Sequence, residues 1–100
     1  MDFLNLKNFL FGYYYQSIWD FYSIDSDIWK AFSLKANLPS KINLLEDVSL
    51  LLSIDDKQEI YQILSNYAEN AGGLSFDTPD ESLNFLINLK SFLENIIDSK

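Results

Sequence analysis

The clearest helical pattern of the chain is TPDESLNFLINLKSFLENII, residues 78–97. Thr78 is followed by proline and, three residues after Thr78, by Glu81, which is the pattern of a capped helix start. Apolar residues then recur at spacings of three and four, the period of one helix face. They are Leu83, Leu86, Leu89, Leu93 and Ile96, with Phe85 and Phe92 widening the stripe. We therefore predict a long closing helix that acts as a central packing element.

The same helical period runs through the rest of the chain. A first helix is expected over residues 2–15, with Tyr13 on its core face. The expected starts are Asp25 and Asp27 for a short second helix, Ser40 for a third, and Asp55, three residues before Gln58, for a fourth. Gly72-Gly73 is expected to end the fourth helix, because glycine adopts the left-handed conformation without a steric cost. The sequence thus predicts an all-α, compact single domain over residues 1–100, a bundle of four to five helices.

The net charge of the chain limits which classes of molecule it could bind. The chain has 15 acids against 7 bases, all of them lysine, and a net charge of −8. An acidic chain without arginine is poorly suited to direct nucleic-acid binding and is repelled by anionic membranes. Its charge favours a basic protein as partner, although acidity that only keeps the protein soluble remains an alternative. The N-terminus lacks the basic start and unbroken apolar stretch of a signal peptide, and we expect a cytoplasmic protein.

Few residues are suited to catalysis or metal binding. The chain contains no histidine and no cysteine, so the commonest general base and the usual zinc ligands are missing. Asp25-Ser26-Asp27 resembles the start of a calcium loop, but Lys30 and Ala36 occupy the positions that require glycine and glutamate. We expect no enzyme activity, no cofactor and no metal. A carboxylate-dependent enzyme acting through Asp55/Asp56 is the least favoured alternative.

The most unusual segment is FGYYYQSIWDFYSI, residues 11–24. Consecutive rings cannot all share one helix face, so at least one is expected at the surface. A platform for stacking bases would need basic residues among the rings, and residues 8–29 contain none. Two interpretations stay open: a second layer of core, or exposed aromatic anchors beside Asp20, a composition favoured at protein interfaces.

This segment also resembles a known family. The order FLFGYYYQ at residues 9–16, then Trp19-Asp20, then an acidic helix start leading to Trp29 and Phe32, is similar to the small immunity proteins of bacterial contact-dependent growth inhibition systems (CdiI-type). Such proteins show a phenylalanine-rich first helix, a Gly-Tyr-Phe-like step and an acidic residue close to tryptophan. The leucine-rich third helix, the short acidic break and the closing amphipathic helix are similar as well.

The resemblance implies a cytoplasmic antitoxin that binds and neutralises the C-terminal toxin domain of a cognate CdiA-like effector. Many such toxins are nucleases with basic clefts, which suits an acidic partner. The expected partner-binding residues form two patches: Tyr15, Trp19, Asp20 and Tyr22, and Glu46, Asp47, Asp56 and Glu59. The alternatives for each residue are a place in the core or on a solvated face. The alternative function is an acidic helical adaptor or regulatory subunit that docks on another basic protein. The oligomeric state stays open.

Overall fold

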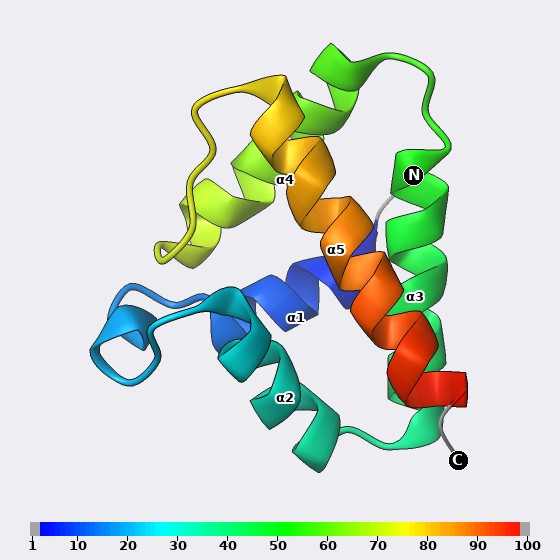
Figure 1. The fold of residues 1–100 in the computed structure, drawn as a ribbon. Coiled ribbons are helices and arrows are strands. Elements are labelled where there is room, and N and C mark those ends of the chain that lie inside the picture. The colour runs from blue at the N-terminus through cyan, green and yellow to red at the C-terminus, as the bar shows by residue number, and fades with distance from the viewer. Residues whose placement is uncertain (1–2, 99–100) are drawn as a thin grey trace.

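Five α-helices and one short 3₁₀-helix account for most of residues 3–98, the part of the chain that this computed structural model describes (Figure 1). In chain order they are α1 (Leu4–Tyr13), the 3₁₀-helix η1 (Ile18–Asp20), α2 (Asp25–Lys35), α3 (Leu38–Leu52), α4 (Lys57–Ala71) and α5 (Pro79–Asp98). Residues 3–98 contain no β-strand, only an isolated bridge between Tyr15 and Gly72. The predicted all-α bundle is confirmed, and the second helix is a complete helix of 11 residues.

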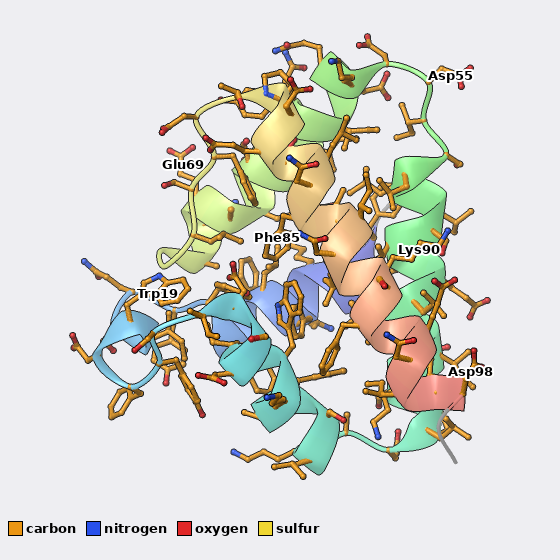
Figure 2. The ribbon with its side chains drawn as sticks, in the orientation of Figure 1. Trp19, Asp55, Glu69, Phe85, Lys90 and Asp98 are labelled. Carbon is orange, nitrogen blue, oxygen red and sulfur yellow. The ribbon has the colours of Figure 1, made fainter. Side chains whose placement is uncertain are left out.

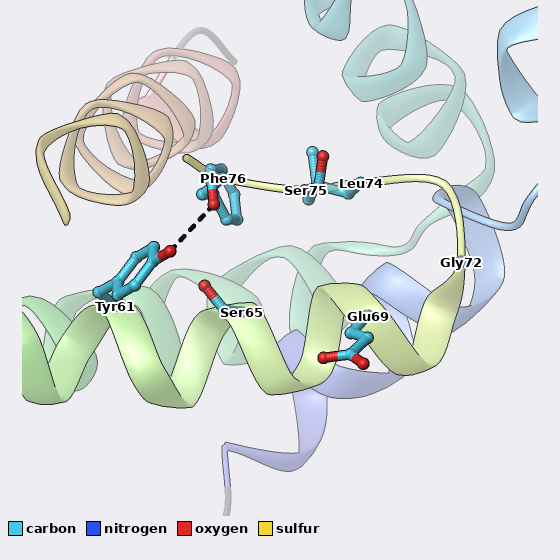
Figure 3. Close-up of a pocket in the computed structure, with 7 residues that line it drawn as sticks. All are labelled: Tyr61, Ser65, Glu69, Gly72, Leu74, Ser75 and Phe76. Carbon is cyan, nitrogen blue, oxygen red and sulfur yellow. Dashed lines mark hydrogen bonds between the residues drawn. The ribbon is translucent and has the colours of Figure 1, made fainter. Parts of the chain in front are cut away.

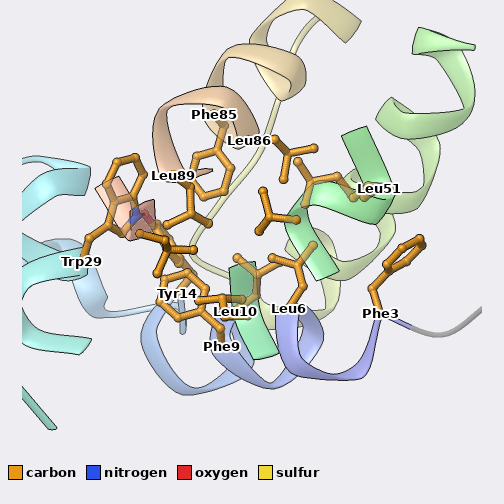
Figure 4. Packing of buried hydrophobic residues seen from close by; sticks show 14 of the residues in the cluster. Phe3, Leu6, Phe9, Leu10, Tyr14, Trp29, Leu51, Phe85, Leu86 and Leu89 are labelled. Atoms are coloured by element: carbon orange, nitrogen blue, oxygen red, sulfur yellow. Dashed lines mark hydrogen bonds between the residues drawn. The ribbon is translucent and has the colours of Figure 1, made fainter. Parts of the chain in front are cut away.

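Helix α5 is the central packing element that its apolar stripe predicted. It packs against α3, α4 and α2, while α1 packs against α3 and α4 (Figure 1). Leu86, Leu89 and Leu93 of α5 are completely buried. Figure 4 shows Leu86 and Leu89 facing the buried side chains of α1. Burying a leucine side chain stabilises the fold by about 1.5–3 kcal/mol, so this helix contributes strongly to the core.

The chain is as compact as a folded protein of this length should be. Its radius of gyration is 12.7 Å, close to the roughly 13 Å expected for 100 residues. Within residues 3–98, no helix has both the length and the apolar character needed to span a membrane.

Helix α3 begins one turn earlier than the sequence indicated. Its cap is Asn37, whose side-chain oxygen accepts a hydrogen bond from the backbone N–H of Ser40 at 2.9 Å. The expectation that Ser40 caps this helix was therefore wrong. Pro39 lies in the first turn, where its missing N–H costs no hydrogen bond, so the proline opens the helix rather than preceding it.

Helix α4 begins and ends at polar and glycine signals. Its cap is Asp56, which accepts from the backbone N–H of Gln58 at 2.9 Å, so the prediction of Asp55 was wrong by one residue. The end of the helix is as predicted, because Gly72 has a φ of 96°, the left-handed conformation that favours glycine.

The start of α1 is capped from another helix. Its own cap residue, Phe3, is buried and supplies no side-chain hydrogen bond. Instead, Asp47 of α3 accepts from the backbone N–H groups of Asn5 at 2.7 Å and Leu6 at 3.1 Å. These N–H groups would otherwise lack a partner, and the carboxylate also suits the positive end of the helix dipole. Asp47, one of the expected partner-binding residues, therefore has a role within the fold.

We predict that Asp47→Ala lowers the free energy of unfolding by about 1–2 kcal/mol, the usual cost of losing a cap. Glu46→Ala is the matched control, since Glu46 is exposed on the same helix and its side chain makes no hydrogen bond or ion pair within residues 3–98. Its effect should lie within about 0.5 kcal/mol of zero. Urea unfolding followed by circular dichroism measures both variants. Equal losses for the two would show that the cap is not stabilising.

Candidate functional site

The connection between α1 and α2, residues 14–24, is anchored by Tyr14. The backbone leaves the helix at this residue (φ −112°, ψ 44°), and its side chain is completely buried. Its hydroxyl donates to Asp25 Oδ1 at 2.6 Å and accepts from Trp29 Nε1 at 2.9 Å. Tyr13, which the helical stripe placed in the core, is only half-buried. The buried ring of the run is therefore Tyr14, because α1 ends before it.

Burial and the Asp25 carboxylate both act on the Tyr14 phenol. Burial raises its pKa well above the usual value near 10, and the hydrogen bond to Asp25 raises it further. The phenol is therefore protonated at neutral pH and always able to donate. A short bond from a neutral donor to a carboxylate is stronger than one between neutral groups, so this junction firmly joins the end of α1 to the first turn of α2.

The same connection is tied to the α4–α5 connection. The backbone N–H of Gly73 donates to the carbonyl oxygen of Tyr14 at 2.8 Å, and Trp19 Nε1 donates to the carbonyl oxygen of Gly73 at 2.6 Å. Tyr15 and Gly72 form the isolated bridge beside these bonds. A Cβ atom on Gly73 would lie 2.2 Å from the carbonyl oxygen of Tyr15, so only glycine fits this approach.

Between these ties, residues 15–24 form an exposed segment that we call the aromatic loop. Ile18 is buried beneath it, and η1 turns the neighbouring side chains outward. Four large apolar side chains are exposed: Tyr15 by 38%, Trp19 by 42%, Phe21 by 71% and Ile24 by 55%. Figure 2 shows Trp19 at the edge of the molecule, beside the α4–α5 connection to which it is bonded. The loop thus presents apolar side chains from a backbone that is fixed at its start.

The first expected patch is found largely within this loop. Tyr15, Trp19 and Asp20 are exposed, whereas Tyr22 is half-buried and packs against the core. The aromatic run is therefore divided between core and surface, and the role of its exposed members as anchors stays a prediction. Sequence reasoning did not select Phe21 and Ile24. The only available signal was their place in the aromatic run, because the direction of each side chain depends on the 3₁₀ turn.

The second expected patch contains residues with different roles. Asp47 is half-buried and caps α1, and Asp56 caps α4. Glu46 on α3 and Glu59 in the first turn of α4 are exposed and make no hydrogen bond or ion pair within residues 3–98. Of the four residues of this patch, Glu46 and Glu59 are the two whose carboxylates could meet a partner without loss of a contact within residues 3–98.

A metal site depends on the positions of the side chains that could bind the ion. Across residues 3–98, no group of three or more acidic side chains is placed to hold a metal ion. Several carboxylates of this part of the chain already have roles in the fold: Asp47 and Asp56 cap helices, Asp25 accepts from Tyr14, and Asp80 pairs with Lys57.

Comparison with known proteins adds no relative. No protein-family model matches the chain, and no curated protein or solved structure matches it either. The resemblance to immunity proteins therefore depends on the residues of the chain itself, chiefly residues 9–32.

The close approach at Gly73 leads to a paired prediction. Gly73→Ala should destabilise the protein by about 1–3 kcal/mol, because the new methyl group overlaps the backbone of Tyr15. Gly12→Ala should instead be neutral or stabilising by up to about 1 kcal/mol, since a Cβ on Gly12 meets nothing within 4 Å and alanine favours the helix. Thermal unfolding of the two variants measures the difference. A Gly73→Ala protein as stable as Gly12→Ala would contradict the close approach.

The Tyr14 junction predicts a loss of stability at high pH. Below about pH 10, Tyr14 is protonated in both states and its contribution is complete. Above that pH the unfolded chain releases the proton while the folded chain retains it, because the folded pKa is raised. The free energy of unfolding should therefore fall by about 1.4 kcal/mol per pH unit for this group.

Urea unfolding across this pH range measures the slope. Tyr14→Phe should be less stable at neutral pH, because Trp29 and Asp25 lose their partner, and its stability should fall less steeply above pH 10. An unchanged slope in Tyr14→Phe would mean that other groups cause the pH dependence.

Proposed function

We propose that this chain is an immunity protein of the contact-dependent growth inhibition type. In this proposal it acts in the cytoplasm, where it binds the C-terminal toxin domain of a cognate CdiA-like effector and neutralises it. The observation that carries the proposal is the aromatic loop, which exposes Phe21 by 71% beside Trp19 and Ile24. The protein would act by binding, without a catalytic step of its own.

The form of the aromatic loop supports a binding role. Clustered exposed apolar side chains are unfavourable in water and mark surfaces that bind partners. Aromatic residues are enriched among the few that carry most of the binding energy. The backbone of this loop is held by the Tyr14 junction and by the Trp19–Gly73 hydrogen bond. Binding would therefore immobilise little additional chain, which preserves affinity.

Charge supports a basic partner such as a nuclease toxin. Asp20 is exposed within the aromatic loop, and Glu46 and Glu59 are exposed carboxylates without a partner within residues 3–98. A net charge of −8 would attract a positively charged cleft and speed association. The aromatic side chains would then limit dissociation, since most affinity differences between related complexes lie in the off-rate.

The test is calorimetry with the C-terminal fragment of the CdiA-like effector from the same locus, at low and at high salt. We expect tight binding that weakens as salt increases, and protection of cells that express the fragment. Phe21→Ala should weaken binding by about tenfold to a hundredfold, as expected for a central aromatic contact. Leu34→Ala is the matched control, because Leu34 is 88% exposed on α2 and lies outside the loop.

Two results would overturn the proposal. A fragment that does not bind at low salt would remove the toxin as partner, and a basic protein retained in its place would favour the adaptor function. If Leu34→Ala weakened binding as much as Phe21→Ala, the aromatic loop would not be the contact surface.

A further inference from the structure

One face of α4 carries four polar side chains at a spacing of four residues. They are Lys57, Tyr61, Ser65 and Glu69, and this spacing places them in a row along one side of the helix. The α4–α5 connection runs back along this row, as Figure 3 shows for residues 72–76. The row and the connection thus face each other over most of the length of α4.

The first two members of the row are bound to the returning chain. Lys57 Nζ lies 2.9 Å from Asp80 Oδ1, and the Tyr61 hydroxyl donates to the carbonyl oxygen of Phe76 at 3.1 Å. Each bond joins α4 to a point in or just after the connection. These two contacts hold the far end of the row closed.

The last two members of the row have no such partner. The Ser65 hydroxyl oxygen is buried and makes no hydrogen bond. The Glu69 side chain is exposed and makes no hydrogen bond or ion pair within residues 3–98. A buried hydroxyl without a partner costs about 1–3 kcal/mol, so the fold leaves one buried polar group, the Ser65 hydroxyl, unsatisfied at this place.

A groove lies where these two side chains are unpaired. Its volume is about 410 Å³, within the usual range for ligand sites. Ser65 and Glu69 line it from α4, Leu74 and Phe76 line it from the connection, and Tyr61 lies where its hydroxyl binds Phe76. Figure 3 shows the Ser65 hydroxyl turned toward the connection and the Glu69 carboxylate turned away from it. One groove therefore combines aromatic and aliphatic walls with a carboxylate and a hydroxyl.

We propose that this groove receives an arginine side chain of the basic partner. A guanidinium group is planar, stacks on aromatic rings and carries several N–H donors in a fixed geometry. After a change of rotamer, the Glu69 carboxylate would accept its N–H groups and neutralise its charge, and the Ser65 hydroxyl would accept another. A lysine ammonium is a compact, strongly hydrated charge and would use the flat walls less well.

The groove adjoins the aromatic loop, so one partner can contact both. Gly72 lines the groove and also forms the bridge with Tyr15, and Trp19 is bonded to the next residue, Gly73. Figure 2 shows Trp19 and Glu69 toward the same side of the molecule. The identity of the partner rests on the proposed function, whereas the preference of the groove for arginine is a property of this chain alone.

The groove is tested first without any partner, by nuclear magnetic resonance titration with the peptide acetyl-Gly-Arg-Gly-amide. We expect shifts of the backbone amides around Ser65, Glu69 and residues 72–76. The citrulline peptide, similar in shape but uncharged, should bind more weakly, and Glu69→Gln should weaken binding of the arginine peptide by about fivefold. Glu94→Gln, which removes an exposed glutamate from α5, should change nothing.

The proposal is overturned if the arginine and citrulline peptides bind equally, if the shifts lie away from the groove, or if Glu69→Gln binds like Glu94→Gln. The toxin fragment then separates this inference from the proposed function. Weaker binding of the fragment by Glu69→Gln than by Glu94→Gln supports the groove. If both variants bind the fragment equally, the groove proposal is overturned and the immunity function is unaffected. If the unchanged protein does not bind the fragment, the immunity function is overturned, and the peptide titration alone decides the groove proposal.

Discussion

A single buried tyrosine joins three parts of this fold. Through its hydroxyl, Tyr14 binds Asp25 and Trp29 of α2, and through its carbonyl oxygen it binds Gly73 of the α4–α5 connection. Its ring packs edge-on against Phe85 of α5. Polar groups removed from water are costly unless each has a partner, and here both hydroxyl functions are used. The point at which the chain leaves α1 is therefore fixed, and the direction of the segment that follows depends on it.

This constraint explains how large apolar side chains remain exposed on a stable protein. The aromatic loop is anchored at its start by Tyr14, from within by buried Ile18, and across its face by the Trp19–Gly73 bond. An exposed apolar loop without such anchors would collapse onto the core or sample many conformations. Rigidity of this kind is what a binding surface requires, because a partner then meets side chains that are already in place.

Helical periodicity was enough to predict the five helices, but not the contacts between distant residues. The apolar stripe of α5 could be predicted because its spacing of three and four residues lies within one short segment of the sequence. The inward direction of Tyr14 was not, since it depends on where α1 ends and on a glycine in a remote connection. Asp47 looked like a free surface acid, because its partners lie on another helix. The row that ends in Ser65 and Glu69 is visible in the sequence, yet its open end follows only from the path of the α4–α5 connection.

Net charge and the aromatic loop are best understood together. Two copies of this chain would each bring exposed rings such as Phe21 and Trp19, and apolar attraction alone would favour their association. A charge of −8 on each copy opposes that encounter. The same negative charge attracts a basic protein, because the two net charges are opposite. In the proposed function the acidity would therefore act as a selector, favouring a basic partner over a second copy of the chain, and discrimination by repulsion is a general means to specificity.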